Sequence, residues 1–170
     1  MRLRVPVFVG GVVTALISLT LGGCSMDQQQ SASAQTIATE RQHTGDAAQA
    51  ALARIDPSAY TAHAEVKPPT LEPCDVSTVD DPNHRRRQWV NQIDLTLATG
   101  VDKTALLTEW TAATRADGWT LAAGISDEPD ANGDGASGLR NGTTTVVLTT
   151  GVEQHAHIVA SSRCLVTTDD

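Results

Sequence analysis

The chain has 170 residues, with 12 Lys+Arg against 20 Asp+Glu, a formal net charge of −8, and few aromatic side chains (3 Trp, 1 Tyr and 1 Phe). This length allows one modest domain with a small core. The acidic balance argues against broad binding of nucleic acid, which requires a basic surface. We therefore expect no nucleic-acid partner.

The first 23 residues have the layout of a secretory leader. Met1–Arg4 is short and positively charged, and residues 5–21 carry no charge and consist mainly of Val, Leu, Ile, Phe, Ala and Gly. This pattern is typical of a signal peptide. Its apolar run of 17 residues is near the shortest length that spans a bilayer, so an uncleaved membrane anchor is the alternative.

The leader ends in Leu21-Gly22-Gly23-Cys24, which resembles the lipobox of bacterial lipoproteins. The resemblance implies that residues 1–23 are removed and that the Cys24 thiol receives diacylglycerol, with further acyl chains such as palmitate. Each buried methylene contributes about 0.8 kcal/mol, so two or three chains form a lasting anchor. The expected location is the extracytoplasmic face of the cell membrane. The mature chain would lose Arg2 and Arg4, leaving 10 basic and 20 acidic residues and a net charge of −10.

With Cys24 assigned to lipid, Cys74 and Cys164 remain as a pair in an oxidising compartment. The simplest prediction is one disulfide between them. Two free thiols that ligate a metal are the alternative, although no Cys or His lies at C-x-x-C spacing from either.

The composition divides the mature chain into segments. Residues 24–35 are polar and of low complexity, which predicts a disordered tether. Large apolar side chains are sparse up to Arg85 and frequent from there on, so we expect the packed core within residues 86–166. Residues 167–170 are a polar tail.

Two segments precede this core. Residues 36–57 have helical composition, strongest over Asp46–Arg54, with Pro57 closing the helix and Gly45 weakening its middle. Residues 58–85 contain four prolines and are expected to form an extended connector along the domain surface, fixed by Cys74.

The core itself shows clearer periods. Alternation predicts a strand over 87–97, and Asp102 is placed to cap a helix over 103–116 that Gly118 ends. A second strand is expected over 119–125, and after an Asp/Gly-rich loop two more over 143–150 and 153–164. The predicted inner face of the helix consists of Leu106, Leu107, Trp110 and Ala113. The predicted inner face of the second strand consists of Trp119, Leu121, Ala123 and Ile125.

This order implies an α+β fold, a two-layer sandwich of a four-stranded, mainly antiparallel sheet with one or two helices on its Trp-bearing face. The order of elements, together with the lipobox and the positions of the two cysteines, resembles small actinobacterial lipoproteins of the LppA-like type. The resemblance implies a surface lipoprotein and carries over no catalytic residue.

One loop suggests calcium. Asp130, Asn132 and Asp134, followed by Gly135, match the first half of an EF-hand loop, in which alternate oxygens converge on one ion. The second half departs from that pattern, because Asn141 stands where a bidentate Glu is needed. A solvated hairpin loop rich in turn formers is the preferred interpretation.

A second candidate is the last predicted strand, where Glu153, His155 and His157 share one face. Same-face positions lie about 6.6 Å apart, so two imidazoles and a carboxylate could bind zinc or copper. The preferred interpretation is polar residues on the wet face of an antiparallel strand, because no fourth ligand can be named.

His84-Arg85-Arg86-Arg87 is the only basic cluster of the chain. It could contact lipid phosphates or an anionic wall polymer, although such a run more often flanks a strand and discourages edge pairing. The sequence contains no G-x-S-x-G, H-E-x-x-H or P-loop motif. The leading hypothesis is therefore a non-enzymatic, lipid-anchored module that binds an envelope protein or wall component without a cofactor. The rival hypothesis is an envelope metal-binding protein.

Overall fold

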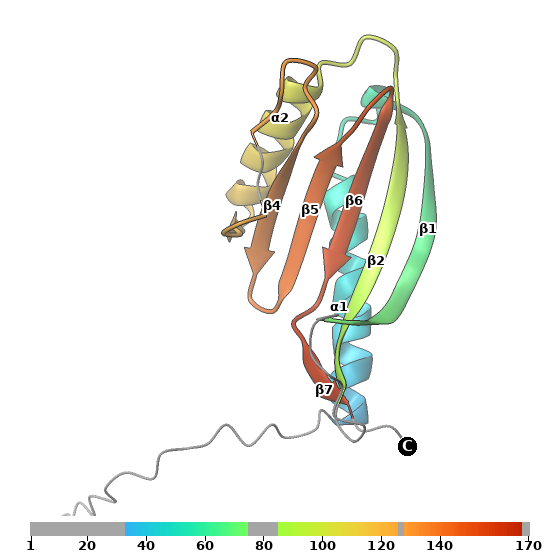
Figure 1. Cartoon of the computed structure of the whole chain (residues 1–170), viewed down its shortest axis with the longest axis vertical. Helices are drawn as coiled ribbons and strands as arrows, with labels where there is room; N and C mark the ends of the chain where they lie inside the picture. The colour runs from blue at the N-terminus through green and yellow to red at the C-terminus, as the bar shows by residue number, and fades with distance from the viewer. Residues whose placement is uncertain (1–32, 75–84, 126–127, 168–170) are drawn as a thin grey trace, which may run out of the picture.

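The structure, a computed structural model, describes residues 33–74, 85–125 and 128–167. These residues form an α+β domain in which two helices pack on one face of an antiparallel sheet of 7 strands (Figure 1). The helices are α1 (Ala34–Leu52) and α2 (Lys103–Ala116), with a short 3₁₀ turn at Pro57–Ala59. The strands are β1 (Tyr60–Pro73), β2 (Arg85–Leu97), β3 (Thr120–Leu121), β4 (Gly135–Asn141), β5 (Thr144–Thr150), β6 (His155–Ser161) and β7 (Leu165–Thr167).

The strand order is β1-β2-β6-β5-β4-β3, and β7 pairs with β2 next to β6. The predicted fold class is confirmed, but the sheet has more strands than the four expected. The additional strands are β1 in the Pro-rich connector, β4 in the Asp/Gly-rich segment, and β7 after Cys164. The predicted leader 1–23, residues 24–32 of the tether and residues 168–170 lie outside the described residues.

Of the connector predicted over 58–85, residues 75–84 lie outside the described residues, and the described part belongs largely to the sheet. Most of it is β1, which pairs along β2 from Tyr60 opposite Leu97 to Pro73 opposite Arg87, with register shifts around the Pro68-Pro69 pair. Proline has no N–H to donate, so it is tolerated in a strand mainly at an edge or a bulge. The edge position of β1 therefore accommodates prolines that argue against a strand when the sequence is read alone.

The strand predicted over 119–125 is much shorter in the structure. Only β3, two residues long, pairs with β4. Ala122 is buried, whereas Leu121 and Ala123 are exposed, so the predicted inner face is wrong. Gly124 has a positive φ of 75°, which turns the chain away from the extended path.

The chain then folds back over β4, which the sequence did not predict. Ile125 packs on Gly138, where an added Cβ would lie 2.9 Å from the Ile125 Cγ2 atom. The strand therefore requires glycine at that position because a side chain would collide with Ile125. Glycine has a low strand propensity, so a strand that contains it is difficult to predict from the sequence.

Helix α1 begins at Ala34, inside the segment expected to be a disordered tether, and ends before Pro57. Ser33 is its N-cap and accepts a hydrogen bond from the Thr36 amide at 3.1 Å. Gly45, expected to weaken the helix, lies against Pro69 of β1, whose Cγ would be 3.3 Å from an added Cβ. Glycine here allows β1 to approach the helix closely.

Helix α2 matches the predicted range, and the Asp102 carboxylate accepts a hydrogen bond from the Ala105 amide at 3.0 Å. Leu106, Leu107 and Trp110 are buried as predicted, but the next buried position is Thr114, and Ala113 is exposed. Thr114 follows Trp110 by one helical turn, and its hydroxyl donates to the Trp110 carbonyl at 2.7 Å. This internal hydrogen bond makes the burial of a polar residue inexpensive.

The core lies between the helices and the sheet. The Trp110 indole N–H donates to the Ala51 carbonyl at 2.9 Å and so joins the two helices. The largest fully buried apolar side chains are Trp110, Ile93, Leu95, Leu139, Leu148, Ile158 and Val146. The face of the sheet opposite the helices is called the open face below. Among the described residues, no helix is long and apolar enough to cross a membrane.

A disulfide joins Cys74 and Cys164, as predicted, with the two Cα atoms 5.9 Å apart. It ties the end of β1 to the segment between β6 and β7.

Candidate functional site

The loop proposed for calcium is held by contacts within the protein. The Asp130 carboxylate accepts hydrogen bonds from the Asp134 and Asn132 amides, at 3.0 and 2.7 Å, and these bonds lower the pKa of Asp130. The Asp134 carboxylate lies 2.6 Å from the Lys103 ammonium, which also donates to the Gly151 carbonyl at 2.7 Å. A cation of the protein thus already contacts one of the proposed ligands, and calcium binding stays a prediction.

The proposed zinc or copper ligands do not all lie on one strand. His155 and His157 are in β6, but Glu153 precedes it in a turn with a positive φ of 62°. The carboxylate beside His157 is Asp94 of β2, with 2.8 Å between the His157 Nδ1 and the Asp94 Oδ1. Within the described ranges, no three His, Cys, Asp or Glu side chains form a group that could hold a metal ion.

Asp94 is the carboxylate that the sequence did not nominate. Burial raises the pKa of Asp94, but the hydrogen bonds from Gln92 (2.8 Å) and His157, together with the charges of His157 and His155, lower it and prevail. The pKa of Asp94 therefore lies below its usual value. The pair connects β2 to β6 across the open face.

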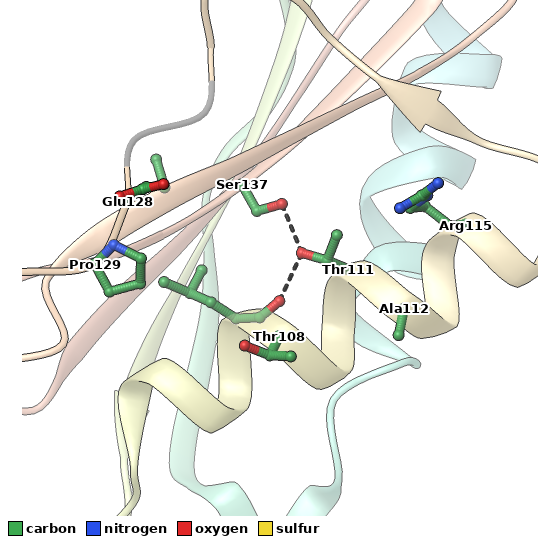
Figure 2. A pocket seen from close by; sticks show the side chains of 9 residues that line it. Thr108, Thr111, Ala112, Arg115, Glu128, Pro129 and Ser137 are labelled. Atoms are coloured by element: carbon green, nitrogen blue, oxygen red, sulfur yellow. Dashed lines mark hydrogen bonds between the residues drawn. The ribbon is translucent and has the colours of Figure 1, made fainter.

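A groove of about 420 Å³ lies between α2 and β4 (Figure 2). Its hydroxyls are engaged within the fold, because the Thr111 Oγ1 donates to the Leu107 carbonyl and lies 2.6 Å from the Ser137 Oγ. Arg115 and Glu128 lie on opposite sides of the groove in Figure 2. The remaining lining is largely apolar and does not specify a class of ligand.

A second hollow, of about 550 Å³, has a more polar lining. It lies on the open face, since its lining residues Thr145 and Val147 alternate along β5 with the core residues Val146 and Leu148. Three arginines line it: Arg86 of β2, Arg140 of β4, and Arg163 between β6 and β7. Of the residues that the structure describes, no Asp or Glu is part of the lining. We call this feature the basic hollow.

The rest of the lining of the basic hollow is partly polar and partly apolar. Its other polar lining side chains are Gln88, Thr143, Thr145, Ser161 and Ser162, and its large apolar ones are Ile125 and Val147. The Arg140 Nε donates to the Thr145 hydroxyl at 3.3 Å, which orients that guanidinium along the face of the sheet. Guanidinium and hydroxyl groups together are the donors that bind oxyanions.

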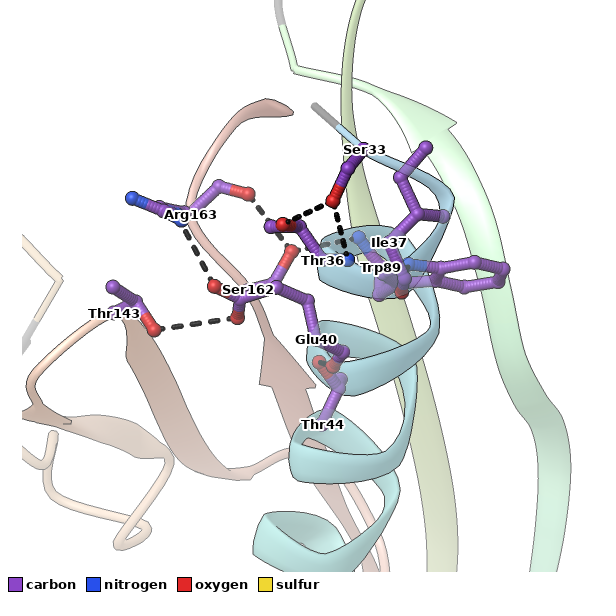
Figure 3. A network of polar contacts seen from close by, with 9 residues as sticks. All are labelled: Ser33, Thr36, Ile37, Glu40, Thr44, Trp89, Thr143, Ser162 and Arg163. Atoms are coloured by element: carbon purple, nitrogen blue, oxygen red, sulfur yellow. Dashed lines mark hydrogen bonds and ion pairs between the residues drawn. The ribbon is translucent and has the colours of Figure 1, made fainter. Parts of the chain in front are cut away.

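A buried carboxylate behind the basic hollow positions Arg163 (Figure 3). Glu40 of α1 has a side chain only 7% exposed, and its Oε1 accepts from the Arg163 Nε at 3.1 Å. Its Oε2 accepts from the Thr143 hydroxyl at 3.3 Å. Burial of a carboxylate is unfavourable unless such partners are present. Glu40 therefore links α1, the β4–β5 turn and the segment that carries Arg163.

Ser162 fixes the backbone of the same segment. Its hydroxyl accepts from the Trp89 amide of β2 at 2.9 Å and donates to the Arg163 carbonyl at 2.8 Å. The Trp89 indole N–H donates to the Ile37 carbonyl of α1 at 2.9 Å (Figure 3). Both the backbone and the side chain of Arg163 are thus held in place by contacts within the protein.

The sequence nominated only one member of this site. Arg86 belongs to the basic cluster at 84–87, but Arg140 and Arg163 are isolated along the chain. The sheet order brings β4, β6 and the start of β2 to one end of the open face. No signal in the sequence alone could have identified this grouping.

The described residues define an α+β domain with two helices on one face of an antiparallel sheet and a basic hollow on the other face. No protein-family model, curated protein or solved structure matches this chain.

Proposed function

We propose that this protein is a lipid-anchored lipoprotein of the cell envelope whose domain is a non-enzymatic binding module for an anionic ligand. The observation that carries the proposal is the basic hollow, whose described lining contains three arginines from separate segments and no carboxylate. Arg163 is paired with Glu40 behind the hollow, so Arg86 and Arg140 are the arginines that we expect to bind the ligand. The chain has a formal net charge of −8, so a hollow lined by three arginines has the opposite sign of charge to the chain as a whole. A bound oxyanion would stabilise such a group of arginines through charge-assisted hydrogen bonds to the guanidinium groups.

The leader and Leu21-Gly22-Gly23-Cys24 support the location. A domain held at the membrane by its amino-terminal cysteine binds its ligand at the extracytoplasmic surface. Metabolic labelling with a fatty acid tests this part of the proposal. Cys24→Ser should abolish the label and leave the precursor largely uncleaved, and a variant that labels as strongly as the parent would contradict lipid attachment.

Calorimetric titration tests the binding function. The protein used is the mature chain, residues 24–170 with Cys24→Ser, which contains every described helix and strand. Glycerol phosphate and vesicles containing phosphatidylglycerol serve as anionic probes. We expect binding that weakens in Arg86→Gln and Arg140→Gln. If no anionic probe binds in a manner that depends on these two arginines, the proposed function is wrong. Elemental analysis and titration with calcium and zinc test the metal-binding alternative on the same material.

A further inference from the structure

The basic hollow lies at one particular end of the domain. Its lining includes residues of the β4–β5 turn, the β6–β7 segment and the start of β2. The start of β2 and the β6–β7 segment lie beside the amino-terminal half of α1 in the lower part of Figure 1, and the β4–β5 turn lies somewhat higher. Glu40, two turns into α1, contacts Arg163 of the hollow directly. The hollow therefore lies at the end of the domain where the chain enters from its amino terminus.

This position places the hollow near the expected anchor. Only 9 residues lead from Cys24 to Ser33, the N-cap of α1. Fully extended, this length spans at most about 30 Å. A lipid attached to Cys24 thus keeps the basic hollow within reach of the lipid headgroups at all times.

We infer that the ligand of the basic hollow is the phosphate headgroup of a membrane lipid, bound while the domain rests with this end against the membrane. The inference rests on the proposed function and specifies its ligand. Arginine guanidinium groups bind phosphate oxygens in pairs of charge-assisted hydrogen bonds, and the hydroxyls of Thr145 and Ser161 can donate to the remaining oxygens. Ile125, 37% exposed, and Val147 provide an apolar wall for the glycerol and first methylenes of a lipid.

The charge distribution also orients the domain. The chain as a whole is acidic, so it has no general electrostatic attraction to a membrane that contains anionic lipid. The Debye length is about 8 Å at physiological salt. The membrane therefore attracts or repels mainly those charges of the domain that lie closest to it. Arg86 and Arg140 attract this end of the domain to the anionic surface, whereas the charge of Arg163 is offset by Glu40. This local attraction favours one orientation of the domain.

Vesicle sedimentation tests the inference with the mature chain carrying Cys24→Ser, so that no acyl anchor contributes. We expect the protein to bind phosphatidylglycerol vesicles and not phosphatidylcholine vesicles. Arg86→Gln and Arg140→Gln should each lower the affinity about fivefold, the typical effect of one arginine near an anionic surface. Arg115→Gln, which removes the same charge from α2 outside the hollow, should change the affinity less than about twofold. All three arginines are exposed, and thermal unfolding checks that the variants remain folded.

A soluble probe distinguishes the two sources of phosphate. Glycerol phosphate, at the same phosphate concentration, should bind at least about tenfold more weakly than the vesicles, because it lacks the membrane surface and the apolar segment. If it binds as tightly, and through Arg86 and Arg140, the ligand is a soluble phosphate ester; the lipid inference then fails while the proposed function stands. If Arg115→Gln weakens vesicle binding as much as Arg86→Gln, the hollow is not the site. If neither probe binds, the proposed function fails as well.

Discussion

Removal of the Cys74–Cys164 disulfide should destabilise the domain through the unfolded chain. The bond joins residues 90 positions apart, a loop that contains β2, α2 and every later strand up to β6. In the chain-entropy model, releasing a loop of this size costs about 4 to 5 kcal/mol of stability at 25 °C. Cys164 is exposed and Cys74 half-buried, so the bond contributes little core packing. Residual structure in the unfolded chain lowers the expected loss to a few kcal/mol, still a large share of a small domain's total.

The assay is urea unfolding of the mature chain with Cys24→Ser, in which Cys74 and Cys164 are the only cysteines. Reductant, or the double substitution of both cysteines by alanine, should lower the midpoint and raise the slope, because an uncrosslinked chain exposes more surface on unfolding. Reductant should have no effect on the alanine variant, which is the control. Two titratable thiols in the protein secreted to the envelope, or an unchanged midpoint on reduction, would refute the reasoning.

Three further predictions concern the core, a helix cap and acid stability. Leu148→Ala removes a fully buried side chain and should lower the free energy of unfolding by about 3 to 5 kcal/mol; Val152→Ala, at a side chain that is 76% exposed, should change it by less than about 0.5 kcal/mol. Asp102→Ala removes the N-cap of α2 and should cost about 1 kcal/mol in the same denaturant titration. The pKa of Asp94 is lowered in the folded state, so its stabilising contribution is present above its unfolded-state pKa and is lost as the pH falls through the folded value. Stability should therefore decline below about pH 4, and Asp94→Asn should reduce that decline in thermal unfolding between about pH 3 and 6.

The elements that the sequence predicted are those whose signal is local. Along β2, Ile93, Leu95 and Leu97 alternate with polar residues, and all three are buried. In α2, Asp102 supplies the cap and Trp110 the buried face. Each pattern repeats within one element, so the neighbouring residues suffice to recognise it.

The missed strands depend on contacts that no local pattern records. β1 contains Pro68 and Pro69, which argue against a strand unless its edge position is known. β4 contains Gly138, which is required because the Ile125 side chain packs directly against it. In both strands the residue that weakens the local signal is explained by a partner distant in the sequence.

The basic hollow also depends on residues that are distant in the sequence. Arg86, Arg140 and Arg163 lie far apart along the chain and line one hollow only because β2, β4 and β6, which Arg163 follows, belong to one sheet. Glu40 shows the coupling between fold and site most directly, because its carboxylate is buried and requires a cationic partner. The partner is Arg163, so the contact that makes the burial of Glu40 on α1 tolerable also fixes an arginine at the border of the hollow. Neither residue has a recognisable role until the other is in place, since the carboxylate would otherwise be an unfavourable buried charge and the arginine a solvated one.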